Sequence, residues 1–197
     1  MAKDSEKFYD RISFLYPIID LFLKPQKRKF FSKINYFPHG RLLEIGIGNG
    51  ANLNYYNTHE ITGVDTSKHM LARASKYQKK HVQLFHMNGQ TLSFPNESFD
   101  YVILSHVIAV VEDPEKLLEE VYRVLKPNGK IFILNHVTPE NWLKYIDKFF
   151  KSISGLFFFK SVFHLSDLPQ LKNFRLQSEC NAGLFSYFKI LIYEKSL

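Results

Sequence analysis

The stretch that decides the fold is Arg41–Asp65, RLLEIGIGNGANLNYYNTHEITGVD. It reads as a short buried strand over Arg41–Ile45, a turn with three glycines at alternate positions, helical residues from about Ala51 to Tyr56, and a second strand. Glycines directly after a strand let the backbone pass close beneath a ligand. A carboxylate that ends the next strand can accept hydrogen bonds from ribose hydroxyls. The pattern therefore predicts a site for an adenosine-containing cofactor at Gly46, Gly48, Gly50 and Asp65.

Strands and helices alternate beyond this stretch. We expect a helix over 67–78, a strand over 82–87, a strand over 101–105, a helix that starts at 113–116 and a strand over 130–134. Two further strands, at about 175–180 and 185–194, are expected to be antiparallel. This order predicts an α/β, Rossmann-like fold with a mostly parallel sheet and helices on both faces.

Four ordered motifs resemble those of class I S-adenosylmethionine-dependent methyltransferases. They are Glu44–Gly50 (EIGIGNG), Thr62–Ser67 (TGVDTS) with Met70-Leu71, Ser98–Ile103 (SFDYVI) and Leu125–Lys130 (LKPNGK), in which Asn128 stands where glycine is common. The resemblance covers residues 41–134 and implies a seven-stranded sheet with an antiparallel last strand. It also implies S-adenosylmethionine as the cofactor and S-adenosylhomocysteine as the product.

The same resemblance implies which residues hold the cofactor. Glu44 lies two residues before the first glycine, where a carboxylate can meet a cation, and Asn88 stands where aspartate is common in the adenine loop. The loop after the fourth strand is expected beside the methionine portion. The expected contacts are Tyr9, Glu44, Gly46, Gly48, Gly50, Asn52, Asp65, Thr66, Met70, Asn88, Gly89, Gln90, Ser105 and His106.

The glycine turn leaves one alternative cofactor open. Gly46-x-Gly48-x-x-Ala51 satisfies the dinucleotide fingerprint formally, so a nicotinamide-dependent reductase is the rival interpretation. Two features weigh against it. Glu44 lies within the strand, and Asp65 follows earlier than the roughly 20 residues that the fingerprint usually has before its acid.

The positive charge gathers in two segments. Residues 1–39 hold eight Lys/Arg against four Asp/Glu, and residues 140–175 hold six against three. Both are rich in large apolar residues, a mixture that suits a surface that meets an anionic membrane or a nucleic acid. In the first segment we expect Pro17 to divide an apolar helical stripe into two short helices, the second of which starts at the proline. A helix packed on its own domain with a solvated basic edge is the alternative to a membrane surface. A nucleic-acid face is not expected, because no motif for one accompanies the charge.

Three local features resemble lipid methyltransferases. Phe8–Arg11 and Tyr16–Asp20 are similar to the paired tyrosine segments of small lipid and quinone methyltransferases. Leu134–Val137 (LNHV) is similar to a segment of the soluble bacterial-type phosphatidylethanolamine N-methyltransferases, and residues 142–168 resemble that family's insert more loosely. The resemblance implies stepwise methylation of phosphatidylethanolamine towards phosphatidylcholine, at the inner face of the cytoplasmic membrane.

Amine methylation suggests candidate catalytic residues. An ammonium must lose a proton before its nitrogen attacks, and His136 or His106 can accept it. Tyr9 and Tyr16 can hold a methylated ammonium by cation–π attraction, with core or lid packing as their alternative role. Rival functions are methylation of an ornithine lipid, a quinone or a small molecule, and a non-catalytic lipid- or RNA-binding module.

Length and composition limit the remaining possibilities. The 197 residues suit one monomeric domain, divided into 1–39 (basic lid or membrane surface), 40–135 (cofactor core), 136–174 (substrate-side insert) and 175–197 (terminal hairpin). One cysteine, Cys180, excludes an internal disulfide framework and fits a cytoplasmic protein. No metal site is expected, since His81 and His86 lack companions at ligand spacing. No transmembrane segment or signal peptide is expected either.

Overall fold

The computed structural model describes residues 16–57, 59–77, 79–136, 168–182 and 188–196, with the backbone alone for residues 16–23 and 136. Tyr9 and most of the two basic segments therefore lie outside the described residues.

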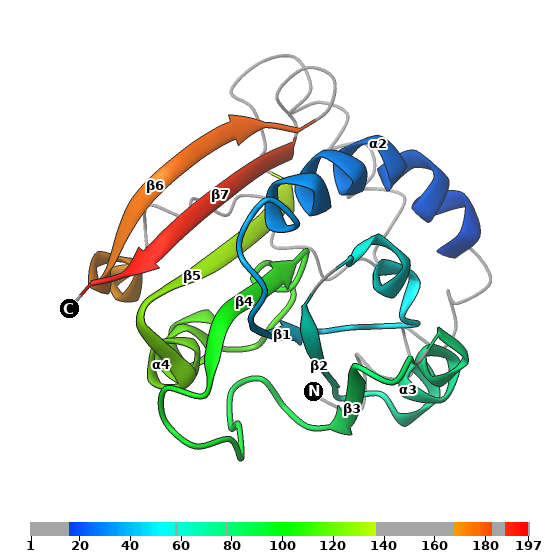
Figure 1. Ribbon diagram of the computed structural model, residues 1–197, viewed down its shortest axis with the longest axis horizontal. Coiled ribbons are helices and arrows are strands. Elements are labelled where there is room, and N and C mark those ends of the chain that lie inside the picture. Colours follow the sequence, from blue (N-terminus) through cyan, green and yellow to red (C-terminus); the bar gives the residue numbers. More distant parts are fainter. Residues whose placement is uncertain (1–15, 58, 78, 137–167, 183–187, 197) are drawn as a thin grey trace.

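The described strands form one seven-stranded sheet in the order β3-β2-β1-β4-β5-β7-β6 (Figure 1). The neighbours from β3 to β5 pair in parallel, and β7 pairs antiparallel with both β5 and β6. This sheet confirms the predicted class I methyltransferase fold with its inserted antiparallel strand. The bounds are β1 Arg41–Ile45, β2 Glu60–Asp65, β3 Val82–His86, β4 Phe99–Ser105, β5 Leu125–His136, β6 Phe174–Asn181 and β7 Phe188–Lys195.

Helices cover both faces of the sheet (Figure 1). The α-helices are α2 (Tyr16–Ile34), α3 (Lys68–Ala74) and α4 (Pro114–Val124), and the 3₁₀ helices are η2 (Ala51–Tyr55), η3 (Ser75–Tyr77) and η5 (Pro169–Asn173). Phe30, Phe31 and Ile34 of α2 pack into one buried cluster. Leu117, Leu118, Val121 and Val124 of α4 pack into the other. No helix in the described ranges is long and apolar enough to cross a membrane.

Side chains fix where the short helices start. The Asp113 carboxylate accepts a hydrogen bond from the Lys116 amide, and Pro114 opens α4, as the sequence predicted. The Ser67 hydroxyl accepts from the Met70 amide in the same way at α3. Both caps satisfy amides that have no partner inside their own helix.

Three elements differ from the sequence-based expectation. The helix expected over 67–78 is a seven-residue α3 followed by a 3₁₀ turn. Helix α2 begins beside Pro17 as expected but continues through Pro25 to Ile34. Strand β5 starts at Leu125, because the Lys126–Gly129 turn bulges out of the strand between two pairings with β4. Asn128 takes a left-handed φ of 59° in that turn, a conformation that asparagine tolerates better than most residues.

Candidate active site

The glycine turn after β1 is held in left-handed backbone conformation. The φ angles of Gly46, Gly48 and Gly50 are 73°, 56° and 76°. A Cβ at Gly46 would lie 2.6 Å from Cγ2 of Val107, and one at Gly50 would lie 2.7 Å from Cα of Ala74. A Cβ at Gly48 would meet nothing within 4 Å. Two glycines therefore allow close packing of the turn, while Gly48 borders open space in which a ligand can approach the backbone.

The Asp65 carboxylate ties the end of β2 to this turn. Its Oδ2 accepts from the Gly48 amide at 2.8 Å, and its Oδ1 accepts from the Ser67 amide at 2.9 Å. Burial raises the pKa of Asp65, against the lowering effect of these amides. A carboxylate offers about four lone-pair positions, so it can accept from a ribose hydroxyl as well as from the amides that hold it.

Glu44 lies fully buried at the end of β1. Its Oε1 accepts from Nδ2 of Asn52 at 2.6 Å, and its Oε2 accepts from the Tyr56 hydroxyl at 2.8 Å. Burial is the main cause that raises the pKa of Glu44 to about 7. Both carboxylate oxygens of Glu44 accept hydrogen bonds, and no surface of the residue is exposed. Glu44 therefore acts on the site indirectly, by holding the Asn52 side chain.

Lys27 lies on the buried side of α2. Only 8% of its surface is exposed, whereas its neighbours Arg28 and Lys29 are exposed. The charge of residues 1–39 predicts a surface position for Lys27, and its burial corrects that prediction. The reason is its position four residues before Phe31 and seven before Ile34, on the apolar stripe of the helix.

The loop after β3 is organised by its own polar groups. Asn88 Oδ1 accepts from the Gln90 amide at 2.9 Å, and Gln90 Oε1 accepts from the Asp113 amide at 3.0 Å. A Cβ at Gly89 would lie 2.5 Å from Cγ2 of Ile45. These contacts bring the predicted adenine loop against β1 and the start of α4, on the side of the sheet edge where β1 and β2 end.

The other predicted cofactor residues between β2 and α3 differ in exposure. Thr66 is exposed, and its carbonyl oxygen lies 2.8 Å from Nε2 of His86. Met70 is buried on the inner face of α3.

The carboxyl ends of β4 and β5 lie side by side, where the substrate that accepts the methyl group is expected. The His106 amide donates to the Leu134 carbonyl at 2.7 Å, and His106 adopts a left-handed φ of 60° just after Ser105. The His106 ring packs edge-on to Phe188, with centroids 5.7 Å apart. Asn135 is 1% exposed, and within the part of the chain that the structure describes neither the oxygen nor the nitrogen of its side-chain amide has a hydrogen-bond partner. His136 is the last residue of β5, so the two candidate histidines end neighbouring strands.

Two predicted tyrosines lie at the limit of the described structure. Tyr9 falls outside the described residues, and Tyr16 is the first residue of α2. Their roles remain predictions.

Comparison with known proteins agrees with this geometry. Residues 43–133 match the protein family described as a methyltransferase domain. They are a methyltransferase domain. The match spans the glycine turn, Asp65, the loop after β3 and most of β5, which are the parts of the chain that build the site. A methyltransferase domain leaves the nicotinamide-reductase interpretation without support.

Relatives of the methyltransferase domain act on different acceptors. A phosphatidylethanolamine N-methyltransferase of Cereibacter sphaeroides is 38% identical over 103 residues, which are 49% of this chain and 51% of that protein. A demethylmenaquinone methyltransferase of Listeria welshimeri is 34% identical over 110 residues, 51% of this chain and 47% of that one. The chain thus spans about half the length of the curated relatives it matches.

Solved structures share the fold over nearly the whole chain. An S-adenosylmethionine-dependent methyltransferase of Thermotoga maritima, described as a "possible histamine N-methyltransferase", superposes with a TM-score of 0.75 at 22% identity. The match covers 96% of this chain and 99% of that one. At this identity the likeness concerns the fold alone.

The methyltransferase domain implies S-adenosylmethionine as its cofactor, and the residues present fit that molecule. Gly48 borders open space, the Asp65 carboxylate lies beside it, and Asn52 Oδ1 is a buried acceptor that has no hydrogen-bond partner among the described residues. A ribose needs acceptors, and the ammonium of an amino acid needs one as well.

Three residues at this site escaped the sequence analysis as site candidates: Lys27, Tyr56 and Asn135. The apolar stripe of α2 was a usable signal for Lys27, since a lysine at helical spacing with Phe31 and Ile34 faces inward. Tyr56 carried no signal, because its contact with Glu44 depends on how tightly η2 folds back on β1.

Proposed function

We propose that this protein transfers methyl groups from S-adenosylmethionine to the amine of phosphatidylethanolamine and of its partly methylated products, towards phosphatidylcholine. The observation that carries the proposal is the 38% identity with a phosphatidylethanolamine N-methyltransferase over 103 residues. The carboxyl edge of the sheet supports it, because polar groups suited to an amine lie there beside the cofactor residues.

The reaction requires that the acceptor nitrogen be positioned and that one proton be removed from it. S-adenosylmethionine supplies, when bound, a methyl group on a positively charged sulfonium. The acceptor ammonium first gives a proton to His106 or His136, which the proposal makes the general bases, and the proton then passes to solvent. The free nitrogen attacks in line, so that an N–C bond forms as the S–C bond breaks. The site contributes mainly by holding the nitrogen in line and excluding water.

Asn135 supports an acceptor site at this edge. A buried amide whose donors and acceptor are unpaired costs about 1–3 kcal/mol for each group. Asn135 follows Leu134 on β5, whose carbonyl accepts from the His106 amide, and both polar atoms of the Asn135 side chain lack partners among the described residues. In the proposal it contacts the headgroup, accepting from the ammonium and donating to the phosphate.

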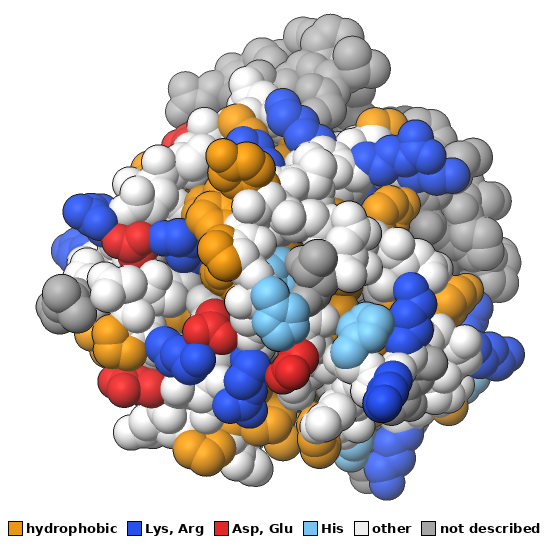
Figure 2. Space-filling model, viewed as in Figure 1, with side chains coloured by type: hydrophobic (Ala, Val, Ile, Leu, Met, Phe, Trp, Pro, Cys, Tyr) orange, Lys and Arg blue, Asp and Glu red, His pale blue; other side chains and the backbone are white. Residues whose placement is uncertain are grey.

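Exposed basic residues of α2 support the proposed binding to a membrane. Lys24, Arg28 and Lys29 are exposed on this helix, and Figure 2 shows basic side chains gathered over it at the upper right, next to residues that are not described. Each basic residue near an anionic leaflet contributes about 1 kcal/mol. Three of them favour reversible docking of the site on lipid.

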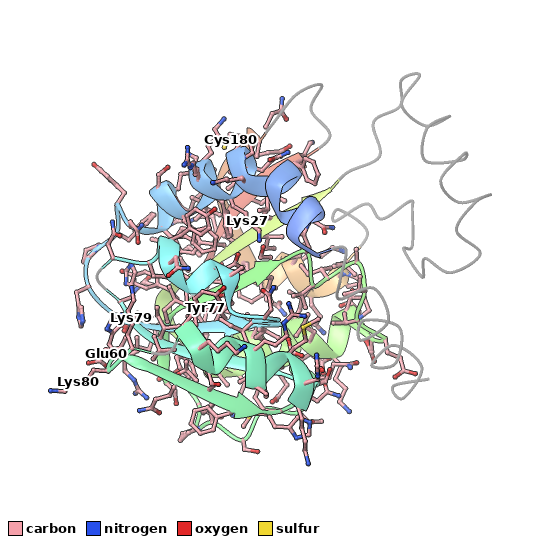
Figure 3. All side chains as sticks on the ribbon, turned by 90° about the vertical axis from the view of Figure 1, so that its right-hand side faces the viewer. Lys27, Glu60, Tyr77, Lys79, Lys80 and Cys180 are labelled. Atoms are coloured by element: carbon pink, nitrogen blue, oxygen red, sulfur yellow. The ribbon has the colours of Figure 1, made fainter. Side chains whose placement is uncertain are left out.

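Changing Lys24, Arg28 and Lys29 together to glutamine is expected to weaken binding to anionic liposomes roughly 10- to 100-fold. Sedimentation with liposomes at physiological salt measures the effect. The matched control changes Lys76, Lys79 and Lys80, which are exposed. Lys76 lies in η3, and Lys79 and Lys80 precede β3, away from α2 (Figure 3). Equal binding by the two triple variants would remove α2 from the membrane surface.

Methyl-labelled S-adenosylmethionine tests the function itself. The purified protein is incubated with anionic liposomes that contain phosphatidylethanolamine, phosphatidylcholine or demethylmenaquinone, and the extracted lipids are separated. We expect label with phosphatidylethanolamine alone, in mono-, di- and trimethylated species. A protein that binds the cofactor but leaves that lipid unlabelled would contradict the proposal.

The liposomes that contain demethylmenaquinone test the second candidate function, methylation of a quinone. The 34% identity with a demethylmenaquinone methyltransferase favours it, and label in that lipid would make a ring carbon the acceptor.

A further inference from the structure

A cavity of about 470 Å³ lies between the exposed side of α2 and the end of η2. This volume falls within the range that small-molecule sites in proteins have. The described residues that line it come from α2, from the two residues that follow α2, and from the end of η2 with Asn57. None of them is one of the expected cofactor contacts.

The cavity lies towards the amino ends of the parallel strands. Tyr36 belongs to the connection from α2 to β1, and Asn57 belongs to the connection from η2 to β2. Both connections enter these strands at their amino ends, whereas Gly48 and Asp65 lie at the carboxyl ends. The cavity is therefore separate from the site of methyl transfer.

Hydrogen bonds and stacked rings hold the walls of the cavity in place. Nδ2 of Asn35 donates to the Tyr55 carbonyl at 2.7 Å, and Oδ1 of Asn35 accepts from the Asn57 amide at 3.2 Å. The Phe31 ring stacks on the Tyr55 ring, with centroids 5.2 Å apart and an angle of 10° between the planes. These contacts fix α2 against η2, so the cavity is formed before a ligand binds and little ordering is left to oppose binding.

The charge at the cavity favours an anion. Arg28 is the one charged side chain among the described lining residues, and it makes no hydrogen bond or ion pair within the described parts of the chain. Its neighbours Lys24 and Lys29 are exposed, and α2 has no acidic residue after Asp20. These charges give the cavity a positive potential.

The neutral donors at the cavity select the kind of anion. The Tyr36 side chain is 89% exposed, and its hydroxyl and the side-chain amide of Asn57 can both donate. A guanidinium binds two oxygens of a phosphate in a bidentate contact and leaves further oxygens for other donors. A carboxylate has only two oxygens, which the same bidentate contact would occupy.

We propose that this cavity binds the phosphate group of a phospholipid headgroup or of a soluble phosphate ester, with Arg28 as the main contact and with Tyr36 and Asn57 as further donors. The inference goes beyond methyl transfer, and it does not depend on which acceptor the protein methylates. A bound headgroup would add one contact of fixed geometry to the diffuse attraction of Lys24 and Lys29 for an anionic membrane.

Calorimetric titration in a phosphate-free buffer at physiological salt tests the site. The probes are glycerol phosphate, a soluble ester, and dihexanoyl phosphatidylglycerol kept below its micelle concentration. Wild-type protein is expected to bind at least one of them with a Kd below about 1 mM. Arg28→Gln should weaken that binding about tenfold or more, because charged hydrogen bonds to the phosphate are lost. Arg28→Lys should recover only part of the affinity, since an ammonium cannot form the bidentate contact.

Lys24→Gln is the matched control, because it removes the same charge from the exposed side of the same helix and does not line the cavity. It should keep nearly the wild-type affinity. Equal losses in Lys24→Gln and Arg28→Gln would show a diffuse attraction and overturn the inference, and so would a wild-type protein that binds neither probe at 1 mM. Tighter binding of the lipid would identify a headgroup as the occupant, and equal affinities would identify a soluble ester. Both of these results support the site.

Discussion

Replacing Asp65 with alanine is expected to lower the affinity for S-adenosylhomocysteine about 100-fold or more, because two hydrogen bonds from ribose hydroxyls to a charged group are lost. The substitution also removes the acceptor for the Gly48 and Ser67 amides. The turn then loses the contact that holds it next to β2. Calorimetric titration at a temperature well below the melting point measures the change in affinity.

Asp100→Ala is the matched control for this variant. Asp100 also accepts a backbone amide, from Arg41 at 2.8 Å, and it also pairs with Lys126. It lies near the amino end of β4, whereas the site lies at the carboxyl ends of the parallel strands. We expect Asp100→Ala to lower stability and leave affinity unchanged. Near-normal affinity of Asp65→Ala would show that the nucleotide site lies elsewhere.

Replacing Glu44 with glutamine is expected to stabilise the protein at neutral pH. The pKa of Glu44 is raised from 4.5 to about 7. Between these values the folded protein holds a proton that the unfolded chain has released, so the free energy of unfolding falls as the pH rises through this window. The full shift corresponds to roughly 3 kcal/mol. The glutamine cannot ionise, and it can still accept from Tyr56.

Thermal melts from pH 4.5 to 8 measure this effect. The melting temperature of Glu44→Gln should exceed that of wild-type protein most at pH 8 and least at pH 4.5. Glu60→Gln makes the same change at an exposed position on the neighbouring strand and should leave the pH dependence as it is (Figure 3). A Glu44→Gln protein that is less stable than wild type at pH 8 would mean that the carboxylate contributes more through its partners than burial costs.

The core of the fold could be predicted because each element has a local signal. Short stretches of sequence are enough to indicate the glycine turn, the caps at Ser67 and Asp113, and the apolar strands. The bulge at Lys126–Gly129 could not be predicted, because it depends on how β4 and β5 come into register. The extent of α2 was missed for a related reason, since packing of Phe30, Phe31 and Ile34 on the sheet outweighs the cost of Pro25 within the helix.

The same distinction holds for the site, where residues in short motifs could be predicted and contacts that depend on the tertiary fold could not. Gly48 and Asp65 were predicted from spacing, because a turn and the end of a strand fix where their groups point. The contacts of Glu44 with Asn52 and Tyr56 depend on how η2 is folded. No short sequence motif predicts them. Lys27 was assigned to the surface because charge was counted by segment, whereas its burial depends on which side of the helix it occupies.

The inserted strand β7 has a consequence for how the protein is made. During synthesis, residues 41–136 leave the ribosome before β7, so β1 to β5 can pair while the outer edge of β5 has no neighbour. That edge carries the apolar run Ile131–Leu134 and offers free amide and carbonyl groups to any other strand. In the finished sheet, β7 (Phe188–Lys195) pairs with this edge. The nascent chain is therefore most prone to aggregate in the interval between the two strands, and rapid completion of translation protects it.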